Sequence, residues 1–415
     1  MAATESWVPV PAGSPFPLQN LPYGIFRRAG EAARVGVAIG DHVLDLAGLA
    51  ADGELAGRDW FASGTLNAFM AAGPAAWHSV RARLTQLLSD PACRPMASRR
   101  LIPRDDVELQ LPVAVGDYVD FYSSRNHAAT VGGIFRPGGP ALPRNWLHLP
   151  VGYHGRAGSV FVSGTPITRP YGQRWQPDAA APEFGPSGRL DFEAEVGFIA
   201  GVPSRPGQPV PPAAFRRHVF GFVLVNDWSA RDIQSFESQP LGPFLGKSFA
   251  TSISGWVVPV AALEAARVPP PAQDPPPLPY LRCREPWGLD LTLTVTLNGN
   301  EISRPPLRGM YWTAPQQLAH ATVNGAPVRT GDLFASGTVS GPGATERGCL
   351  LEMTHDGTRP LSLPDGSTRA YLADGDVLRI SATAPGAGGV TIGFGEVEGR
   401  VEPATDGTPP HMARL

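Results

Sequence analysis

The chain has 415 residues, of which 42% are hydrophobic and 17% charged, and its formal net charge is −3. This length exceeds the size at which a single core usually stops growing, so we expect a soluble globular protein of two domains. The small net charge, without any run of five Lys or Arg, excludes general binding to nucleic acid or to an anionic membrane surface.

Targeting and redox signals favour a cytoplasmic protein. The first residues lack a basic region followed by an apolar one, so we expect no secretion signal. The longest strongly apolar stretch, near residues 219–225, is too short to span a bilayer. Three scattered cysteines (Cys93, Cys283 and Cys349) form no CxxC motif, which fits a reducing compartment.

Residues 1–114 are predicted to form a small domain of mixed structure. Apolar residues alternate over 35–39, a Gly-Asp turn follows, and residues 43–46 return as the partner strand of a hairpin. An Ala- and Leu-rich pattern over about 66–88 predicts helix, interrupted near the Gly73-Pro74 pair.

Residues 115–415 are predicted to be mostly short strands, in keeping with the 48 glycines and 46 prolines of the chain. Alternating Leu and Val over 289–297 end in Asn298-Gly299, a pair that favours a type I′ hairpin. Further strands are expected at 377–380 and 390–395. One helix should begin at Thr313, with Gln316 completing a capping box. The larger domain is therefore expected to be an antiparallel sandwich or roll.

Residues 191–196 alternate between acidic and apolar side chains. In one strand Asp191, Glu193 and Glu195 would share a face, with the two glutamates roughly 6.6 Å apart. At an effective dielectric constant near 20 their charges would repel by about 2.5 kcal/mol. Because the flanking residues are apolar on both faces, the pattern favours a buried strand whose carboxylates bind a cation.

Two other segments carry residues suited to chemistry. Asp120 and Tyr122 share one side of a predicted strand, and His127 follows five residues after Tyr122. The apolar run at 219–225 ends in Asn226-Asp227, after which Ser229 is predicted to cap a short helix that carries Arg231 and Gln234 on one face. A strand-end carboxylate (Asp227), a cationic side chain (Arg231) and an amide donor (Gln234) that converge in this way suit the binding of a metal and an oxyanion.

Each residue also has an ordinary structural explanation. Asp120 and Asp227 can act as turn or strand-end caps, His127 can be a satisfied polar residue, and the acidic strand can be a solvated face. If the carboxylates do bind a metal, an all-oxygen ligand set selects Ca²⁺ or Mg²⁺ over zinc.

Taken together, five segments resemble the fumarylacetoacetate hydrolase family. They read GDYVDFYSSR at 116–125, NWLHLPVGYHGR at 145–156, NDWSARDIQ at 226–234, LGPFLGKS at 241–248 and ASGTVSGP at 335–342. The resemblance covers nearly the whole chain. It implies a mainly β protein with an SH3-like barrel at 1–114, a large β-roll or β-sandwich at 115–415, few helices, and a homodimer.

The resemblance also implies an activity, namely metal-dependent hydrolysis of the carbon–carbon bond of 4-fumarylacetoacetate to fumarate and acetoacetate, at the end of tyrosine and phenylalanine breakdown. A Ca²⁺ or Mg²⁺ ion would stabilise the enolate of the leaving acetoacetate. The nearest alternatives of the same superfamily are an acylpyruvate hydrolase and a decarboxylase or hydratase of another 2-oxo acid. A catalytically silent metal-binding scaffold is the alternative from another class.

Carried over by position, the resemblance assigns a role to each site residue. The metal ligands are Asp120, Glu193, Glu195 and Asp227, and a second, structural Mg²⁺ locus adds Lys247 and Thr251 beside Asp227. His127 is the general base and Glu352 orients it. Arg231, Gln234 and Lys247 stabilise the oxyanion, and the residues that hold the substrate are Tyr122, Arg136, Tyr153, Gln234 and Thr338.

Two positions depart from the family pattern. Ser238 occupies the position of a substrate-contacting Tyr, and Ala250 replaces a Gly, which leaves that backbone less free. Neither position is a metal ligand or the base, so we expect altered substrate affinity rather than a lost reaction.

Overall fold

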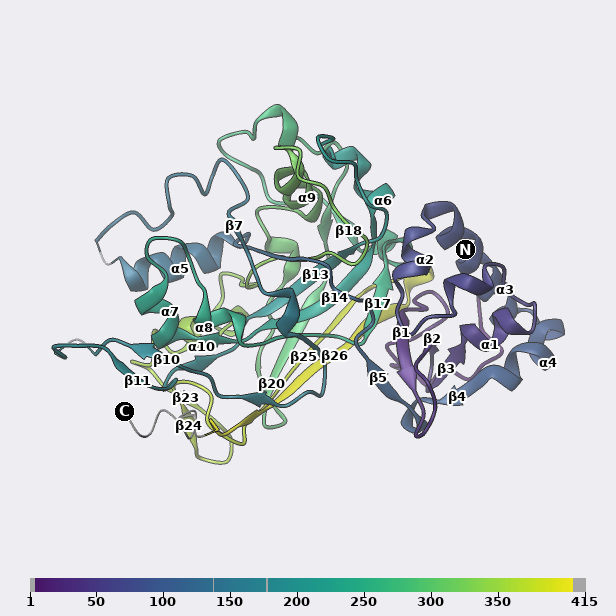
Figure 1. Ribbon diagram of the computed structural model, residues 1–415, viewed down its shortest axis with the longest axis horizontal. Helices are drawn as coiled ribbons and strands as arrows, with labels where there is room; N and C mark the ends of the chain where they lie inside the picture. The colour runs from purple at the N-terminus through teal and green to yellow at the C-terminus, as the bar shows by residue number, and fades with distance from the viewer. Residues whose placement is uncertain (1–3, 137, 177, 406–415) are drawn as a thin grey trace, which may run out of the picture.

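The computed structural model describes residues 4–136, 138–176 and 178–405, and it is built mainly from β-strands (Figure 1). One sheet has 13 strands and a second has five, and the remaining strands form two-stranded pairs. Few helices accompany the strands, as the sequence predicted. Among the described residues, no helix is both long enough and apolar enough to cross a bilayer.

The large sheet runs through both halves of the chain. Its main path, in spatial order, is β4 (Leu101–Pro103), β3 (His42–Asp45), β2 (Arg34–Ile39), β1 (Tyr23–Arg27), β17 (Trp256–Pro259), β14 (Val219–Asp227), β13 (Ala194–Ala200), β22 (Leu333–Ala335), β6 (Tyr118–Phe121) and β7 (Gly152–His154). Off this path, β16 (Thr251–Ile253) pairs with β14 and β8 (Val160–Val162), and β5 (Glu108–Gln110) pairs with β1. The path is open, so over the described ranges its strands do not close into a barrel.

The second sheet faces the large one across the main core. Its order is β21 (Asn300–Ser303), β20 (Thr292–Leu297), β25 (Val377–Pro385), β26 (Thr391–Glu402) and β9 (Ile167–Thr168). One hydrophobic cluster joins Phe198 and Leu224 of the large sheet to Val295, Ile380 and Phe394 of the smaller one. Both sheets are mixed rather than purely antiparallel, because β6–β22, β8–β16 and β9–β26 pair in parallel.

The two-stranded pairs are β10 (Tyr171–Arg174) with β11 (Glu183–Pro186), β12 (Leu190–Asp191) with β15 (Ser229–Ala230), β18 (Arg267–Val268) with β19 (Gly288–Leu289), and β23 (Leu361–Ser362) with β24 (Thr368–Arg369). The α-helices are α1 (Leu46–Ala51), α2 (Asn67–Ala71), α3 (Pro74–Ser89), α4 (Arg94–Ala97), α5 (Arg125–Phe135), α6 (Phe215–His218), α7 (Arg231–Glu237), α8 (Leu245–Ser248), α9 (Ala314–Thr322) and α10 (Leu350–Met353).

Several predicted elements are confirmed. β2 and β3 form the expected hairpin, and the helical stretch is split into α2 and α3 just before Pro74. The β20–β21 hairpin turns at Asn298-Gly299, whose φ angles of 50° and 79° are both positive, as a type I′ turn requires. Helix α9 follows Thr313, with the expected capping box to Gln316.

Two local predictions were wrong. The acidic segment 191–196 is not one strand, because Phe192 and Glu193 lie between β12 and β13. Ser229 does not cap α7: it lies in the short strand β15 paired with Asp191, and Ala230 occupies the cap position. In both cases the β12–β15 pairing overrides the local pattern.

Candidate active site

Four carboxylates converge where neighbouring strands of the large sheet end. Asp120 lies on β6, Glu195 on β13 and Asp227 at the end of β14, and β22 joins β6 to β13. Glu193 precedes β13. One oxygen from each carboxylate lies within 4.8 Å of the others, and all four residues are buried. The structure thus brings together the four residues that the sequence predicted as metal ligands.

This group of carboxylates has the properties of a cation site. Asp120 Oδ1 and Glu195 Oε1 are buried and, within the described part of the chain, accept no hydrogen bond. Burial and the Asp227 carboxylate raise the pKa of Asp120 well above its usual range, and burial with Asp120 and Glu193 does the same to Glu195. A divalent cation among these oxygens would remove the repulsion, and hard oxygen donors suit Ca²⁺ or Mg²⁺. The residues therefore fit such an ion.

Lys247 already supplies one positive charge to this group. Its Nζ lies 2.6 Å from Glu193 Oε2 and 2.9 Å from Asp227 Oδ2. Burial alone would lower the pKa of Lys247, but Asp227 and Glu193 outweigh burial and raise it. Thr251 Oγ1 donates to Asp227 Oδ1 at 2.9 Å. Lys247 and Thr251 thus flank Asp227, where the resemblance places a second Mg²⁺ site. Because an ammonium nitrogen cannot ligate a metal, Lys247 could contribute only its backbone oxygen to that site.

Asp191 does not belong to the carboxylate group, contrary to the expectation from the acidic pattern. Its Oδ2 accepts from Arg231 Nε at 2.9 Å, and its two oxygens accept from the N–H groups of Leu350 and Leu351 at the start of α10. Because the chain is irregular at residues 192–193, this carboxylate is free to point elsewhere. Asp191 thereby links Arg231 to the turn that carries Glu352.

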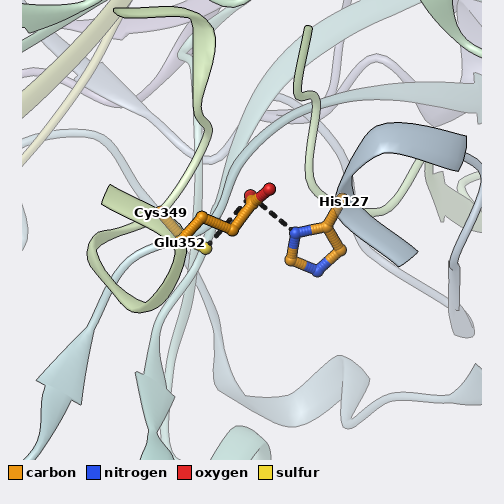
Figure 2. Close-up of side chains that lie close together, drawn as sticks. All are labelled: His127, Cys349 and Glu352. Carbon is orange, nitrogen blue, oxygen red and sulfur yellow. Dashed lines mark hydrogen bonds and ion pairs between the residues drawn. The ribbon is translucent and has the colours of Figure 1, made fainter. Parts of the chain in front are cut away.

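His127 and Glu352 form a buried pair, although 225 positions separate them (Figure 2). His127 lies in the first turn of α5, where the Ser124 side chain caps the helix by accepting the His127 N–H. The ring Nδ1 lies 2.7 Å from Glu352 Oε2. Burial would raise the pKa of Glu352, but the contacts with His127 and Ser340 outweigh burial and lower it, so the carboxylate is ionised beside the ring.

Arg231 and Gln234 lie together at the start of α7, as their spacing predicted. Arg231 Nη1 donates to Glu193 Oε1 at 2.7 Å and to Gln234 Oε1 at 3.2 Å. The buried Nη2 has no partner among the described residues, so it remains a free donor. Lys247 and Arg231 together lower the pKa of Glu193 far below its usual range, although burial opposes this.

A cavity of about 610 Å³ connects these groups. Its wall includes His127, Arg231 and Lys247 together with Asp120 and Glu193 of the carboxylate group. The volume falls in the range of small-molecule sites, and charged side chains in the wall are typical of a site that orients a polar ligand.

Most of the residues expected to hold substrate line the same cavity, and one does not. Tyr122, Arg136, Tyr153 and Gln234 are in its wall. Tyr153 donates to Asp227 Oδ2 at 3.1 Å, whereas Arg136 is exposed at the end of α5. The buried Thr338 is absent from the wall, and its hydroxyl finds no partner within the ranges described.

The two departures from the family pattern have simple structural settings. Ser238 is the C-cap residue of α7, where its hydroxyl donates to the Gln234 carbonyl, and it lines the cavity. Ala250 is buried, and its φ is not positive, so the methyl group adds no backbone strain there.

The sequence did not predict several groups that orient the site residues by hydrogen bonds. Gly337 donates its backbone N–H to Glu195 Oε2 at 2.9 Å, and a Cβ at Gly337 would lie 2.1 Å from the Phe121 carbonyl oxygen. The sequence did contain a signal at this position, namely the glycine. Its φ of 78° is one that other residues rarely adopt, so the position favours Gly. The orientation of Asp191 and the hydroxyl of Ser340 beside Glu352 had no comparable signal.

Comparison with known proteins gives the same family for both halves of the chain. Residues 118–402 match the sequence profile described as "Fumarylacetoacetate (FAA) hydrolase C-terminal", and residues 19–112 match "Fumarylacetoacetase N-terminal". The fumarylacetoacetase of Bos taurus is 49% identical, covering 96% of this chain and 99% of its own length, and that of Homo sapiens is 48% identical with the same coverage.

A solved structure supports the same fold at lower identity. The fumarylacetoacetate hydrolase of Exiguobacterium antarcticum aligns with a TM-score of 0.56 at 18% identity, covering 93% of this chain and all of that one. The two profiles, the near full-length relatives and the arrangement of His127, Glu352 and the carboxylates lead to one conclusion. The chain belongs to the fumarylacetoacetate hydrolase family.

Proposed function

We propose that this protein is a hydrolase that cleaves the carbon–carbon bond of 4-fumarylacetoacetate to give fumarate and acetoacetate. The observation that carries the proposal is a cavity whose wall brings His127, the partner of the buried Glu352, together with Arg231, Lys247 and members of the carboxylate group. The near full-length relatives, named fumarylacetoacetase, support this substrate.

His127 is the proposed general base. With Glu352 ionised, the hydrogen of the ring lies on Nδ1 and is donated to Glu352, which leaves Nε2 free to accept a proton from water. The water oxygen then bonds to the ketone carbon as the carbonyl becomes an alkoxide. When the carbon–carbon bond breaks, the electron pair goes to the leaving acetoacetate carbon, and His127 can return the proton there.

Arg231, Gln234 and Lys247 are the proposed partners of the alkoxide. The free Nη2 of Arg231 supports this role, because a buried donor without a partner is available to an oxyanion at no further desolvation cost. Arg231 is fixed by Asp191 and Glu193, so its guanidinium is already oriented before substrate binds.

Asp120, Glu193, Glu195 and Asp227 are the proposed ligands of Ca²⁺ or Mg²⁺, with Lys247 and Thr251 proposed for a second Mg²⁺ locus beside Asp227. The ion would supply positive charge that stabilises the enolate form of the leaving group. Tyr122, Tyr153 and Thr338 are proposed to hold the substrate oxygens. Arg136 suits a substrate carboxylate because its planar fork can bind both oxygens.

The finer structural and cellular expectations are part of the same proposal. These are an SH3-like fold for residues 1–114, a β-roll for residues 115–415, a cytoplasmic location and a homodimer. Exposed apolar side chains support self-association: Leu241, in the cavity wall, is 95% exposed, and Phe244, in the same loop, is also exposed. Sedimentation should give twice the 43.9 kDa mass of the chain, and a monomer at micromolar concentration would contradict the dimer.

A direct assay tests the activity. Purified protein supplied with Ca²⁺ or Mg²⁺ should convert fumarylacetoacetate to fumarate and acetoacetate, with a kcat/KM well above that for acylpyruvates. Preference for an acylpyruvate, or decarboxylation or hydration of another 2-oxo acid, would replace the proposed substrate. The absence of any turnover would favour a metal-binding scaffold.

A further inference from the structure

Ser340 contacts Glu352 directly, and it contacts Ser124 and Asn126 at the start of the helix that carries His127. We propose that Ser340 is a positioning residue for the general base, with its hydroxyl fixing the Glu352 carboxylate and its carbonyl fixing the helix that carries His127. This inference rests on the proposed role of His127 as the base. Ser340 is buried and does not line the cavity, so it acts through its neighbours and not on the substrate.

The carbonyl of Ser340 holds the start of helix α5. It accepts from Ser124 Oγ at 3.1 Å and from Asn126 Nδ2 at 3.2 Å. Ser124 in turn caps the helix by accepting the His127 N–H. The side chains of Ser124 and Asn126 therefore connect the Ser340 carbonyl to the start of the helix that carries His127.

The hydroxyl of Ser340 holds the carboxylate. Its Oγ accepts the Gly348 N–H at 3.0 Å and donates to Glu352 Oε2 at 2.6 Å. Because the Gly348 N–H fills one acceptor position on Oγ, the hydroxyl hydrogen is directed at Glu352. Oε2 thus accepts from both Ser340 and His127 Nδ1, and this double acceptance favours the ionised carboxylate.

This arrangement determines which ring nitrogen carries the hydrogen. An ionised Glu352 can only accept, so Nδ1 of the neutral ring must donate and Nε2 must be the basic nitrogen. Without the Ser340 hydroxyl, Glu352 loses a donor and protonates more readily, and a protonated Glu352 can donate to Nδ1 and favour the other tautomer. Two other groups face Glu352: Arg347, whose Nη1 lies 3.6 Å from Oε1, and Cys349, whose Sγ lies 3.4 Å from Oε2 (Figure 2). Neither replaces the Ser340 hydroxyl, because Arg347 lies beyond hydrogen-bond distance of the other oxygen and a thiol is a weak donor.

Ser254 provides a matched control. It is also fully buried, and its hydroxyl also accepts one backbone N–H, that of Leu224 at 3.0 Å, and donates once, to the Trp256 carbonyl at 3.1 Å. Ser254→Ala therefore removes the same kind of buried hydroxyl without touching His127 or Glu352. Any loss of stability should be similar in Ser340→Ala and Ser254→Ala.

The kinetic test compares these variants with the wild type. Ser340→Ala should lower kcat by about 10–100-fold, the value expected for losing a hydrogen bond to a charged group, with KM nearly unchanged. The acidic limb of its kcat–pH profile should move to higher pH, because Glu352 protonates more readily. Ser254→Ala should retain the kcat and pH profile of the wild type. A Ser340→Ala enzyme with wild-type kcat and pH profile would overturn the inference.

A spectroscopic test does not depend on turnover. In ¹⁵N-histidine spectra, assigned by the signals missing from His127→Gln, the wild-type His127 ring should carry its hydrogen on Nδ1, and Ser340→Ala should shift population to the Nε2–H tautomer. An unchanged tautomer would refute the inference even if the enzyme acts on another substrate. Should Ser340→Ala fail to fold, Ser340→Cys, which keeps a weak donor, should show the same changes in smaller measure.

Discussion

At the scale of single residues, the candidate active site depends on buried carboxyl groups whose pKa values are shifted by their neighbours. Glu352 and Glu193 have lowered pKa values because cationic or donor groups contact them, although burial opposes this in both cases. Asp120 and Glu195 form no ion pair among the described residues, each keeps one buried oxygen without a hydrogen bond, and their pKa values are raised. These two carboxylates therefore have the greatest need of a bound cation.

The first residue-scale prediction concerns the base. His127→Ala should lower kcat by about 10²–10⁴-fold, the usual contribution of general-base help, while the fold and the metal content stay unchanged. Circular dichroism and metal analysis provide the controls. Glu352→Gln, which keeps the shape but removes the charge beside Nδ1, should also lower kcat. If His127→Ala kept half of the wild-type activity, another residue would have to be the base.

The second residue-scale prediction concerns the cation. Chelation by EDTA should abolish activity, and Ca²⁺ or Mg²⁺ should restore it. Because the metal-free protein raises the pKa of Asp120 and Glu195, ion binding must displace protons, so affinity should increase with pH as these carboxyls ionise. Calorimetry in two buffers of different ionisation enthalpy would measure the released protons. Full activity after exhaustive chelation would refute the metal site.

At the scale of elements, a buried carboxylate joins a hairpin to its neighbouring strand. Asp376, just before β25, accepts from Arg369 Nε and Nη2, both at 2.9 Å, and from Asn298 Nδ2 at 2.8 Å. Asn298 Oδ1 also accepts the Val377 N–H at 2.8 Å. The β20–β21 turn is therefore held to the start of β25 by side chains as well as by strand pairing.

The element-scale prediction follows from these contacts. Asp376→Ala should destabilise the protein by about 2 kcal/mol, because it removes the hydrogen bonds that Arg369 and Asn298 donate to a charged carboxylate. Burial would raise the pKa of Asp376, but the Arg369 contact outweighs it, so the wild-type contribution should be present above about pH 4 and lost as pH falls through the lowered pKa. Denaturant unfolding at pH 7 and at acid pH measures both effects. Asp365→Ala is the control and should leave the midpoint unchanged, because this exposed carboxylate accepts, among the described residues, hydrogen bonds from Ser367 alone.

At the scale of the whole molecule, the N-terminal segment shares its sheet and core with the larger part. Strand β1 of the N-terminal segment pairs with β17 of the larger part, so the large sheet contains strands from both sides of residue 114 (Figure 1). Tyr23 and Phe69 pack on Phe220 of β14, with ring centroids 5.4 and 5.6 Å apart. The division into 1–114 and 115–415 stays a prediction, but the two parts share buried apolar surface.

The whole-molecule prediction is that the two parts unfold together. A fragment of residues 115–415 should aggregate, because it would expose Phe220, Val223 and Val257, which pack on the N-terminal segment in the same hydrophobic cluster. Calorimetry of the full chain should give one transition. Two separate transitions, or a soluble and folded fragment, would show that the parts are independent.

The sequence by itself determined the mainly β class, the β2–β3 and β20–β21 hairpins, the helices around Pro74 and after Thr313, and the family with its candidate residues. These depend on local periodicity, turn chemistry and motif content, which a single chain displays directly. Only the tertiary structure decided that segment 191–196 is divided between two strands. As a result, Asp191 accepts a hydrogen bond from Arg231, whereas Glu193 and Glu195 lie with Asp120 and Asp227. The contacts of His127 with Glu352, and of Glu352 with Ser340, likewise join residues far apart in sequence, and packing and pairing across the whole sheet decide where such residues meet.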